Sequence, residues 1–458
     1  MTTVAFIAFT LCLMIGIRNA LRTTASIHWI EEGNRPPSGD GSCGLKFVIL
    51  LPLLREQKVI NKLVTRMASL ELSVATDVSF VFITTSREGS GEGSSASVLD
   101  ALLRQQPNPH FIHLHCTTGV DRYKSDQLNY ALQQLGLTGQ RNEQVFIGVY
   151  DADSSPDPRT LTFIAQAVER NAELKAIQQV PFYFQNVRNP KSVRELYLMT
   201  RPVHNLLFGL TIEVPCMRQQ AALFSRPRTS IKRIANGWLS HGLGHGQFFR
   251  LDTLTDHGGF QPPSCDTQFG HALAFCGVPI EPHPMLDVGQ TPESVRVLMR
   301  QGVVWFNSMN TFWRTKQMVS RLAAPNYSRA GAWAMMARIV HSNLAWSVYP
   351  ILFLAALIWS IASSHYLLVG YGLLAWAVYL VPVALILAHF NRWARWCSRF
   401  EPIRSLSLST KVGMLLMFGV EKLGSCVSPF LWCFYALRRL FRGTPIQLRK
   451  TEREEACG

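Results

Sequence analysis

Residues Val145–Pro156 read VFIGVYDADSSP, an apolar run typical of a buried strand that ends in two carboxylates and turn residues. Side chains two positions apart in a strand point to the same side, so Asp151 and Asp153 can converge on one cation where the strand ends. A divalent cation held by two carboxylates usually takes its other ligands from water and substrate phosphates. Asp also favours turns and helix N-caps, so a structural turn is an equal alternative for this pattern taken alone.

The composition favours a membrane-associated protein. The chain has 458 residues, a net charge of +15, eleven Trp and a mean hydropathy of +0.10. Its basic residues concentrate beside apolar segments, which suits anionic lipid headgroups better than a nucleic-acid surface. The sequence contains no zinc-finger, RRM or helix-turn-helix signature, so we expect membrane lipids and no nucleic acid among its partners.

The cysteines argue against a thiolate metal site. The ten cysteines lie far apart and form no Cys-x-x-Cys pair. This usage is typical of small buried hydrophobes in a reducing compartment.

The N-terminus reads as an uncleaved transmembrane anchor over residues 1–22. An apolar run over Val4–Ile17 is followed, not preceded, by Arg18 and Arg22, which is the reverse of a secretory signal. The positive-inside rule then places the N-terminus outside and the next domain in the cytoplasm. Residues 23–44, which include a Gly-, Pro- and Ser-rich stretch, are predicted to be a linker.

Residues 45–311 are predicted to form a globular α/β domain with a largely parallel sheet. Apolar strand-like runs alternate here with helical patterns, as in layered α/β proteins. The predicted strands are Leu45–Leu54, Val78–Thr84, Phe111–His115, Val145–Tyr150 and Ala176–Val180.

The remaining third is predicted to be helical and bound to the membrane. Residues 312–342 mix basic and aromatic side chains, as interfacial amphipathic helices do. Residues 343–390 contain two long apolar runs separated by a tight turn, which predicts two transmembrane helices. Residues 391–458 are predicted to form a basic loop, a re-entrant or interfacial hairpin and a cytoplasmic tail. We therefore expect an integral membrane protein of a cell inner membrane or an endomembrane, with three spans and a cytoplasmic catalytic domain.

Further motifs flank the two carboxylates in a fixed order. Upstream lie a strand running into Pro52 and Glu56, and then Lys124-Ser-Asp-Gln-Leu-Asn129. Downstream lie Gly258-Gly-Phe260, then Asp266, and then Gln301-Gly-Val-Val-Trp305. This order over roughly three fifths of the chain resembles the family-2 glycosyltransferases, whose catalytic domain is of the Rossmann-like GT-A type.

The resemblance implies a donor site for a nucleotide-sugar. Asp151 and Asp153 would hold Mn²⁺ or Mg²⁺ against the diphosphate. Lys124 would lie near the nucleotide or position the loop of these carboxylates. The nucleotide pocket would be lined by Pro52, Leu54 and Glu56.

At the acceptor end, the resemblance implies that Asp266 is the general base that takes a proton from the attacking hydroxyl. His245, Gln301 and Trp305 are candidate acceptor-binding residues. A loop histidine without a chemical role and an aromatic that only packs are equal alternatives for His245 and Trp305.

The sequence departs from the family pattern at four places. Ile83-Thr84-Thr85 replaces a strand end that usually carries Asp, which leaves nucleotide recognition to another group, with Glu88 as the candidate. The Ala of the Lys motif is Gln127, the Glu before Asp266 is Cys265, and the Arg of the last motif is Val304. The last change weakens the case for processive synthesis, because that motif grips the acceptor in polysaccharide synthases.

These patterns together predict an inverting glycosyltransferase that uses a UDP- or GDP-sugar and a membrane-proximal acceptor, either lipid-linked or a glycan. A processive polysaccharide synthase is the alternative within this class. A GT-A-like membrane scaffold without catalysis is the alternative outside it.

Overall fold

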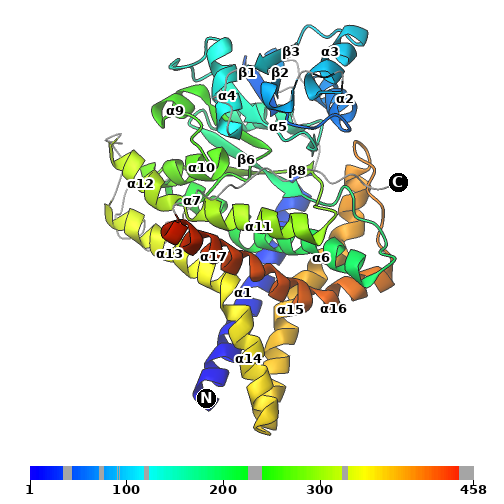
Figure 1. The fold of residues 1–458 in the computed structure, drawn as a ribbon, viewed down its shortest axis with the longest axis vertical. Helices are drawn as coiled ribbons and strands as arrows, with labels where there is room; N and C mark the ends of the chain where they lie inside the picture. The colour runs from blue at the N-terminus through cyan, green and yellow to red at the C-terminus, as the bar shows by residue number, and fades with distance from the viewer. Residues whose placement is uncertain are drawn as a thin grey trace.

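The computed structural model describes residues 1–34, 44–71, 77–89, 91, 93–117, 123–224, 240–321 and 329–442. It shows an α/β body from which three helices extend, with further helices lying crosswise between the two parts (Figure 1). The predicted α/β class with a largely parallel sheet is confirmed.

The sheet runs in the order β3-β2-β1-β4-β7-β6-β8-β5. Strand β1 pairs in parallel with β2 and β4, β2 with β3, and β6 with β8. Strand β7 is antiparallel to both β4 and β6, and β5 is antiparallel to β8. Six of these strands therefore share one direction, and their carboxyl ends meet at a single edge of the sheet.

The five predicted strands are present as β1 (Lys46–Pro52), β2 (Asp77–Thr85), β3 (Phe111–Cys116), β4 (Val145–Val149) and β6 (Ala176–Phe182). The sequence did not predict β5 (Ser155–Pro156), β7 (Gln247–Arg250) or β8 (Glu281–Val288). Two of these are very short, and β8 contains two prolines, which are atypical inside a strand.

The central strands are apolar throughout because helices cover both faces of the sheet. Phe47 and Ile49 of β1 pack with α2 (Ile60–Glu71), α3 (Ser95–Gln105) and α5 (Thr160–Arg170). Val48 and Leu50 point the other way, toward α4 (Lys124–Gln134), α9 (Leu251–Asp256) and α10 (Cys265–Cys276). This alternation is the period-two pattern of a strand buried on both sides.

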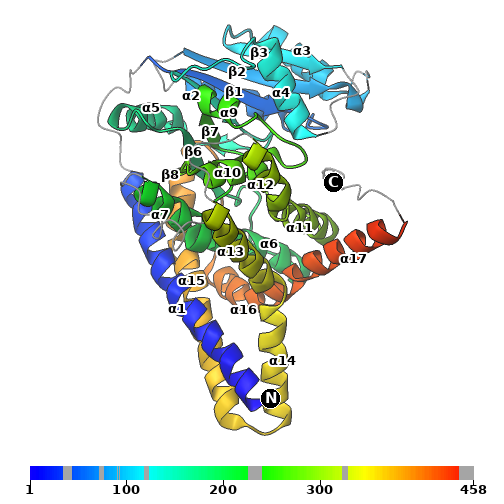
Figure 2. The ribbon, with the colours of Figure 1, turned by 90° about the vertical axis from the view of Figure 1, so that its left-hand side faces the viewer.

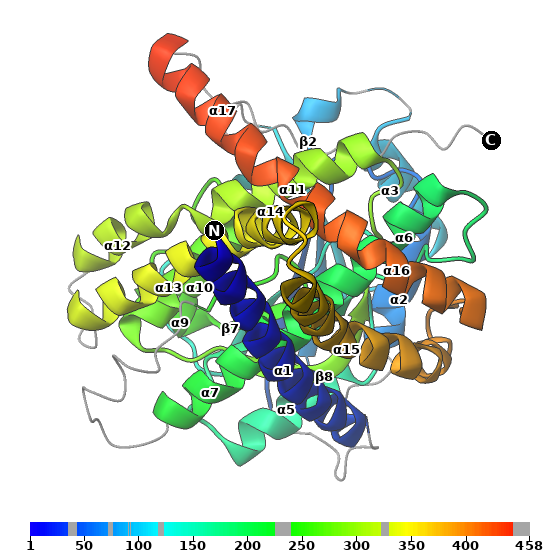
Figure 3. The same cartoon turned by 90° about the horizontal axis from the view of Figure 1, so that it is seen from below.

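Beneath the sheet lies a layer of helices drawn from residues 193–442 (Figure 2). Its members are α6 (Val193–Phe208), the π-helix η2 (Gly209–Glu213), α7 (Val214–Phe224), α11 (Val295–Met309), α12 (Phe312–Arg321), α13 (Arg329–Ser347), α16 (Leu408–Ser425) and α17 (Val427–Arg442). A short 3₁₀ helix, η1 (Ser86–Glu88), follows β2. Seen from below, α13, α16 and α17 lie crosswise around the three extending helices (Figure 3).

The extending helices are α1 (Thr2–Gly33), α14 (Tyr349–Ala362) and α15 (Tyr366–Cys397). Within the described residues, three helices are long and apolar enough to cross a membrane: α1, α15 and the joined segment Leu408–Arg438. The pair α13 and α14, bent by 45°, would make a fourth. Helix α1 does not end at the predicted boundary at residue 22 but continues to Gly33, over part of the predicted linker.

Candidate active site

The predicted donor-site side chains meet at the carboxyl edge of the sheet. Asp151 and Asp153 follow β4, and Lys124 opens α4 after β3. The Lys124 ammonium lies 2.6 Å from Asp151 Oδ1 and donates to the Gly244 carbonyl at 2.6 Å. Its pKa is raised, since the attraction of Asp151 and other acidic groups outweighs burial. The Lys124 side chain is 28% exposed and that of Asp151 is 43% exposed, and a pair this accessible contributes roughly 0–1 kcal/mol to stability.

Asp266 lies across the same loop. It stands in the first turn of α10, where the helix N-terminus favours a carboxylate. Ser264 Oγ donates to its Oδ1 at 3.1 Å. A Cβ added at Gly244 would stand 2.8 Å from Asp266 Oδ2, and the Gly244 φ of +86° also favours glycine. The backbone at Gly244 therefore lies between the side chains of Lys124 and Asp266.

The turn that carries the two carboxylates is held from several directions. Ser154 Oγ accepts from the Asp151 amide at 3.2 Å. Asp153 Oδ2 accepts from the Gln290 amide at 3.2 Å, and the fully buried Asp287 Oδ1 accepts from the Ser155 amide at 3.1 Å. The end of β8 thus supports the turn that follows β4.

His245 is buried beneath this turn, between two partners. Its Nδ1 lies 2.5 Å from Asp287 Oδ2, and its Nε2 lies 2.9 Å from the Tyr183 hydroxyl. Burial opposes protonation of His245, but the nearby carboxylates, chiefly Asp287, outweigh it and raise its pKa to about 8. Both nitrogens are therefore engaged by the protein, which favours a supporting role for His245.

The loop containing His245 is fixed by a side chain of β6. The Gln178 amide donates to the His245 carbonyl at 2.9 Å, and its oxygen accepts from the Leu243 amide at 2.9 Å. Gln178 is buried, so these hydrogen bonds are shielded from water.

The residues predicted to line the nucleotide pocket lie at the end of β1. Pro52 and Glu56 are buried there, and Leu54 is partly exposed. Glu88, the candidate substitute for the missing Asp, accepts hydrogen bonds from the Arg55 amide, from Gln57 at 3.2 Å and from the Ser95 amide at 2.8 Å. These contacts show Glu88 tying the β1 loop to α3.

Gln127 has a structural reason to differ from the family pattern. Its amide donates to the carbonyls of Leu53 at 3.2 Å and Ile83 at 3.4 Å. It thereby links the carboxyl ends of β1 and β2, which alanine could not do.

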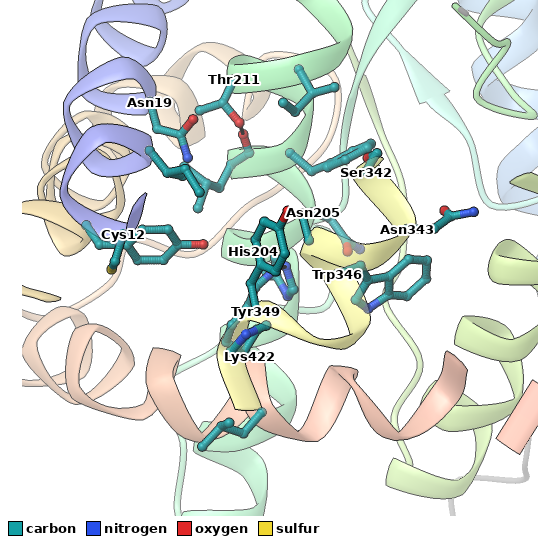
Figure 4. Close-up of a pocket in the computed structure, with 18 of the residues that line it drawn as sticks. Cys12, Asn19, His204, Asn205, Thr211, Ser342, Asn343, Trp346, Tyr349 and Lys422 are labelled. Atoms are coloured by element: carbon teal, nitrogen blue, oxygen red, sulfur yellow. Dashed lines mark hydrogen bonds between the residues drawn. The ribbon is translucent and has the colours of Figure 1, made fainter. Parts of the chain in front are cut away.

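A cavity of about 690 Å³ begins at Asp266 and continues between the extending helices. Trp305 lines it, and the Arg201 guanidinium stacks on the Trp305 ring at 5.5 Å. Figure 4 shows Cys12 and Asn19 of α1, His204 of α6 and Lys422 of α16 around this space. Among the described residues that line it, Gln301 is absent, although Gln301 lies on the same helix as Trp305.

The chemistry of the carboxylate turn fits a hard divalent cation. Asp151 and Asp153 offer oxygen ligands, and both side chains are partly exposed on one supported turn. Within the described ranges, no group of three His, Cys, Asp or Glu side chains could hold a metal by itself.

Several residues of this region had no motif to reveal them. Asp287, Tyr183 and Gln178 lie on strands β6 and β8 or just beyond, far in sequence from the carboxylates that they support. Glu401 is the most distant: its buried carboxylate accepts from Ser155 Oγ at 2.8 Å and pairs with Arg66. Only the fold brings these groups together.

No family model matches the chain, and no curated protein matches it. Among solved structures, it is similar to the mannosyltransferase PcManGT from Pyrobaculum calidifontis in complex with GDP-Man and Mn²⁺, at 13% identity and a TM-score of 0.43, covering 92% of this chain and 99% of the other. It is also similar to the glucosyl-3-phosphoglycerate synthase from Mycobacterium tuberculosis in complex with Mn²⁺, UDP and phosphoglyceric acid, at 13% identity and a TM-score of 0.36, covering 64% and 85%. These similarities are remote, so the proposals below depend on the residues of this chain.

Proposed function

We propose that this chain is a membrane-bound inverting glycosyltransferase of GT-A type, related to family 2, which transfers a sugar from a UDP- or GDP-sugar to a membrane-proximal acceptor. The observation that carries the proposal is the meeting of Lys124, Asp151 and Asp266 at one edge of the sheet. A cavity leads from Asp266 toward the apolar helices.

The donor would lie along the carboxyl edge between the β1 loop and Asp151. Asp151 and Asp153 would hold Mn²⁺ or Mg²⁺, which supplies positive charge to the diphosphate as the leaving group. Lys124 would add a second cation on the same side. Pro52, Leu54 and Glu56 would shape the nucleotide pocket.

In the reaction, the acceptor oxygen bonds to the anomeric carbon while the bond from that carbon to the diphosphate oxygen breaks. Asp266 takes the proton of the acceptor hydroxyl, and the bonding electrons leave with the diphosphate. One displacement inverts the anomeric centre and requires no enzyme nucleophile. Trp305 and Arg201 would form the wall against which the acceptor lies, whereas His245 would hold the turn through Asp287 and Ser155.

The apolar lining of the cavity favours single transfer to an amphipathic acceptor over a processive synthase, because a growing glycan needs a polar path. Nucleotide binding distinguishes the two enzyme hypotheses, which require it, from the scaffold alternative, which does not.

The first test is thermal unfolding of the detergent-solubilised protein with UDP, GDP and their sugars, in Mn²⁺ or in EDTA. A ligand at 100 times its Kd stabilises the folded state by about 2.7 kcal/mol, so binding is measurable without knowing the acceptor. We expect one diphosphate to raise Tm in Mn²⁺ only, and Asp151→Asn and Asp153→Asn to remove this rise.

Two variants complete this test. Asp266→Asn should keep the nucleotide-dependent rise and lower transfer to extracted membrane lipids by roughly 10²–10⁴-fold. Asp256→Asn, an exposed aspartate paired with Arg141, is the control and should change neither. Folded protein that no nucleotide stabilises would establish the scaffold alternative instead.

A further inference from the structure

The cavity is long and reaches from the catalytic edge deep into the apolar helices. Asn19 and Val4 of α1 both line it, and fifteen residues of helix span about 22 Å. Half of a bilayer's hydrocarbon core is about 15 Å thick, so the cavity is long enough for a lipid chain.

The apolar end of the cavity is open to the side. Several of its lining residues are large apolar side chains that remain exposed on α1, α14 and α16: Ile7, Leu11, Leu352, Leu354, Leu416 and Val420. Exposed apolar side chains around an entrance suit a hydrocarbon environment and are unfavourable in water. A ligand entering here would come from the bilayer.

A buried polar network of α6 and α16 also borders this cavity. Glu421 accepts from Arg201 at 2.8 Å and lies 2.6 Å from His204 Nδ1. The other ring nitrogen of His204 lies 3.2 Å from the Lys422 ammonium. Arg201, His204 and Lys422 all line the cavity, and Glu421 lies fully buried behind them.

This network carries an excess of positive charge. Burial lowers the pKa of His204 to about 4, against the pull of Glu421, so His204 is neutral at physiological pH. Arg201 and Lys422 then share the carboxylate of Glu421. Burial lowers the pKa of Lys422 against the attraction of Glu421, so its charged form is held at a cost that a bound anion would relieve. The acids that line the cavity, Glu213 and Asp266, belong to η2 and α10, and His241 lies 3.4 Å from Glu213. An uncompensated cation beside an apolar space is costly unless a ligand supplies the opposite charge.

We propose that the cavity binds an anionic lipid acceptor, with its hydrocarbon chain between α1 and α14, its phosphate at Lys422 and Arg201, and its headgroup hydroxyl toward Asp266. This inference rests on the proposed function for the direction of transfer. Arg201 stacks on Trp305, and Ser308, one turn further along the same helix, is joined to Asp266 through Ser264. The cations therefore lie on the side of the cavity toward Asp266, which selects a lipid whose phosphodiester joins the chain to a hydroxyl-bearing headgroup.

The test uses the full chain in phosphatidylcholine nanodiscs and a photoreactive hexadecyl phosphate as the probe. We expect labelled peptides from α1 and α14, and displacement of the label by hexadecyl phosphate. Hexadecanol and inorganic phosphate should each displace it at least about tenfold less well, because a charged hydrogen bond and the chain are both needed. Equal displacement by hexadecanol would overturn the phosphate assignment, and displacement by inorganic phosphate alone would overturn the lipid.

Two pairs of matched variants locate the site. Lys422→Gln should weaken labelling about tenfold, whereas Lys411→Gln, on the same helix and outside the cavity lining, should not. Ile7→Trp should block labelling, whereas Ile17→Trp should not, since both residues are about half exposed on α1 but only Ile7 lines the cavity. Equal labelling within either pair would contradict the proposed site.

The nucleotide-dependent Tm is measured on the same samples. Lipid labelling without any nucleotide effect would support the lipid site and reject the glycosyltransferase. A nucleotide effect without specific labelling would support the glycosyltransferase and reject the lipid site.

Discussion

At the scale of single residues, His245 makes the protein's stability depend on pH. Its folded-state pKa of about 8 lies above the usual value of 6.5, so its protonated form stabilises the fold. This contribution is complete below pH 6.5 and is lost as pH rises through 8, a change of about 2 kcal/mol. The buried His204, His257, His271 and His283 have lowered pKa values, so they oppose this change near pH 6.5, where the unfolded chain still protonates them, and they are neutral in both states only above about pH 7.5.

We therefore expect Tm to fall between about pH 7.5 and 9 in the wild type and to fall less in His245→Gln. Gln can still donate to Asp287 but carries no charge. Differential scanning fluorimetry over this range measures the difference between the two slopes. Identical slopes would show that folding does not raise the pKa of His245.

The residues of the candidate site show what sequence alone can predict. Asp151, Lys124 and Asp266 were predicted from motif order and lie together. The sequence did not predict the residues that hold the site in place. These residues, Asp287, Gln178 and Glu401, approach the site only through strand pairing or chain reversal. A single sequence can reveal functional residues that stand within short motifs. Contacts between segments far apart in the sequence produce no periodic pattern, so they cannot be predicted in this way.

At the scale of elements, the loop after α15 anchors the carboxylate turn. The Glu401 side chain is 1% exposed, and its carboxylate forms an ion pair with the Arg66 guanidinium. Arg66 also donates to the carbonyls of Asp153 and Ser154 at 3.4 Å. The Lys62 ammonium lies 2.6 Å from Glu401 Oε1, and the Gln185 amide donates to the same oxygen at 2.9 Å. The segment that follows an apolar helix thus holds the backbone of the proposed metal site.

Glu401→Gln should destabilise the protein by about 3 kcal/mol, because it leaves the buried Arg66 without its charge partner. It should also weaken the Mn²⁺-dependent stabilisation by the nucleotide, since the turn loses a support. Asp77→Asn, which breaks the exposed pair with Lys46, should change neither property measurably. Urea unfolding and nucleotide titration measure the two effects. Unchanged nucleotide affinity would limit Glu401 to a purely stabilising role.

The packing of α1 against α15 depends on a glycine. A Cβ at Gly16 would lie 2.8 Å from the backbone nitrogen of Tyr379. Gly16→Ala must therefore separate the two helices, at a cost of about 1–3 kcal/mol. A Cβ added at Gly370 on α15 would have no atom within 4 Å, so Gly370→Ala should leave the stability unchanged or raise it slightly. Thermal unfolding in detergent compares the two variants, and equal Tm values would mean that α1 and α15 do not pack this closely.

At the scale of the whole molecule, composition predicted the layout and failed at the boundaries. Periodic apolar runs located the central strands and the apolar helices, because both bury long apolar surfaces. The end of α1 at Gly33 was missed because its last turns are polar and pack against the body through Ile27 and Ile30. The joined segment Leu408–Arg438 is long enough to span by composition, yet α16 and α17 lie crosswise to α1 and α15 (Figure 3).

The arrangement in a membrane can be tested at three exposed positions. We expect α1, α14 and α15 to cross the bilayer and α16 with α17 to lie on its cytoplasmic face. Helix α14 is about 21 Å long by its 14 residues, short of the roughly 30 Å core, so the end of α13 would also enter the bilayer. In a variant with Cys12, Cys43, Cys433 and Cys457 replaced by Ser, Ser364→Cys should react with an impermeant maleimide in intact cells. Ser398→Cys and Phe441→Cys should react only after permeabilisation. Labelling of Phe441→Cys from outside would make Leu408–Arg438 a further span, and it would separate the basic end of α17 from the proposed active site.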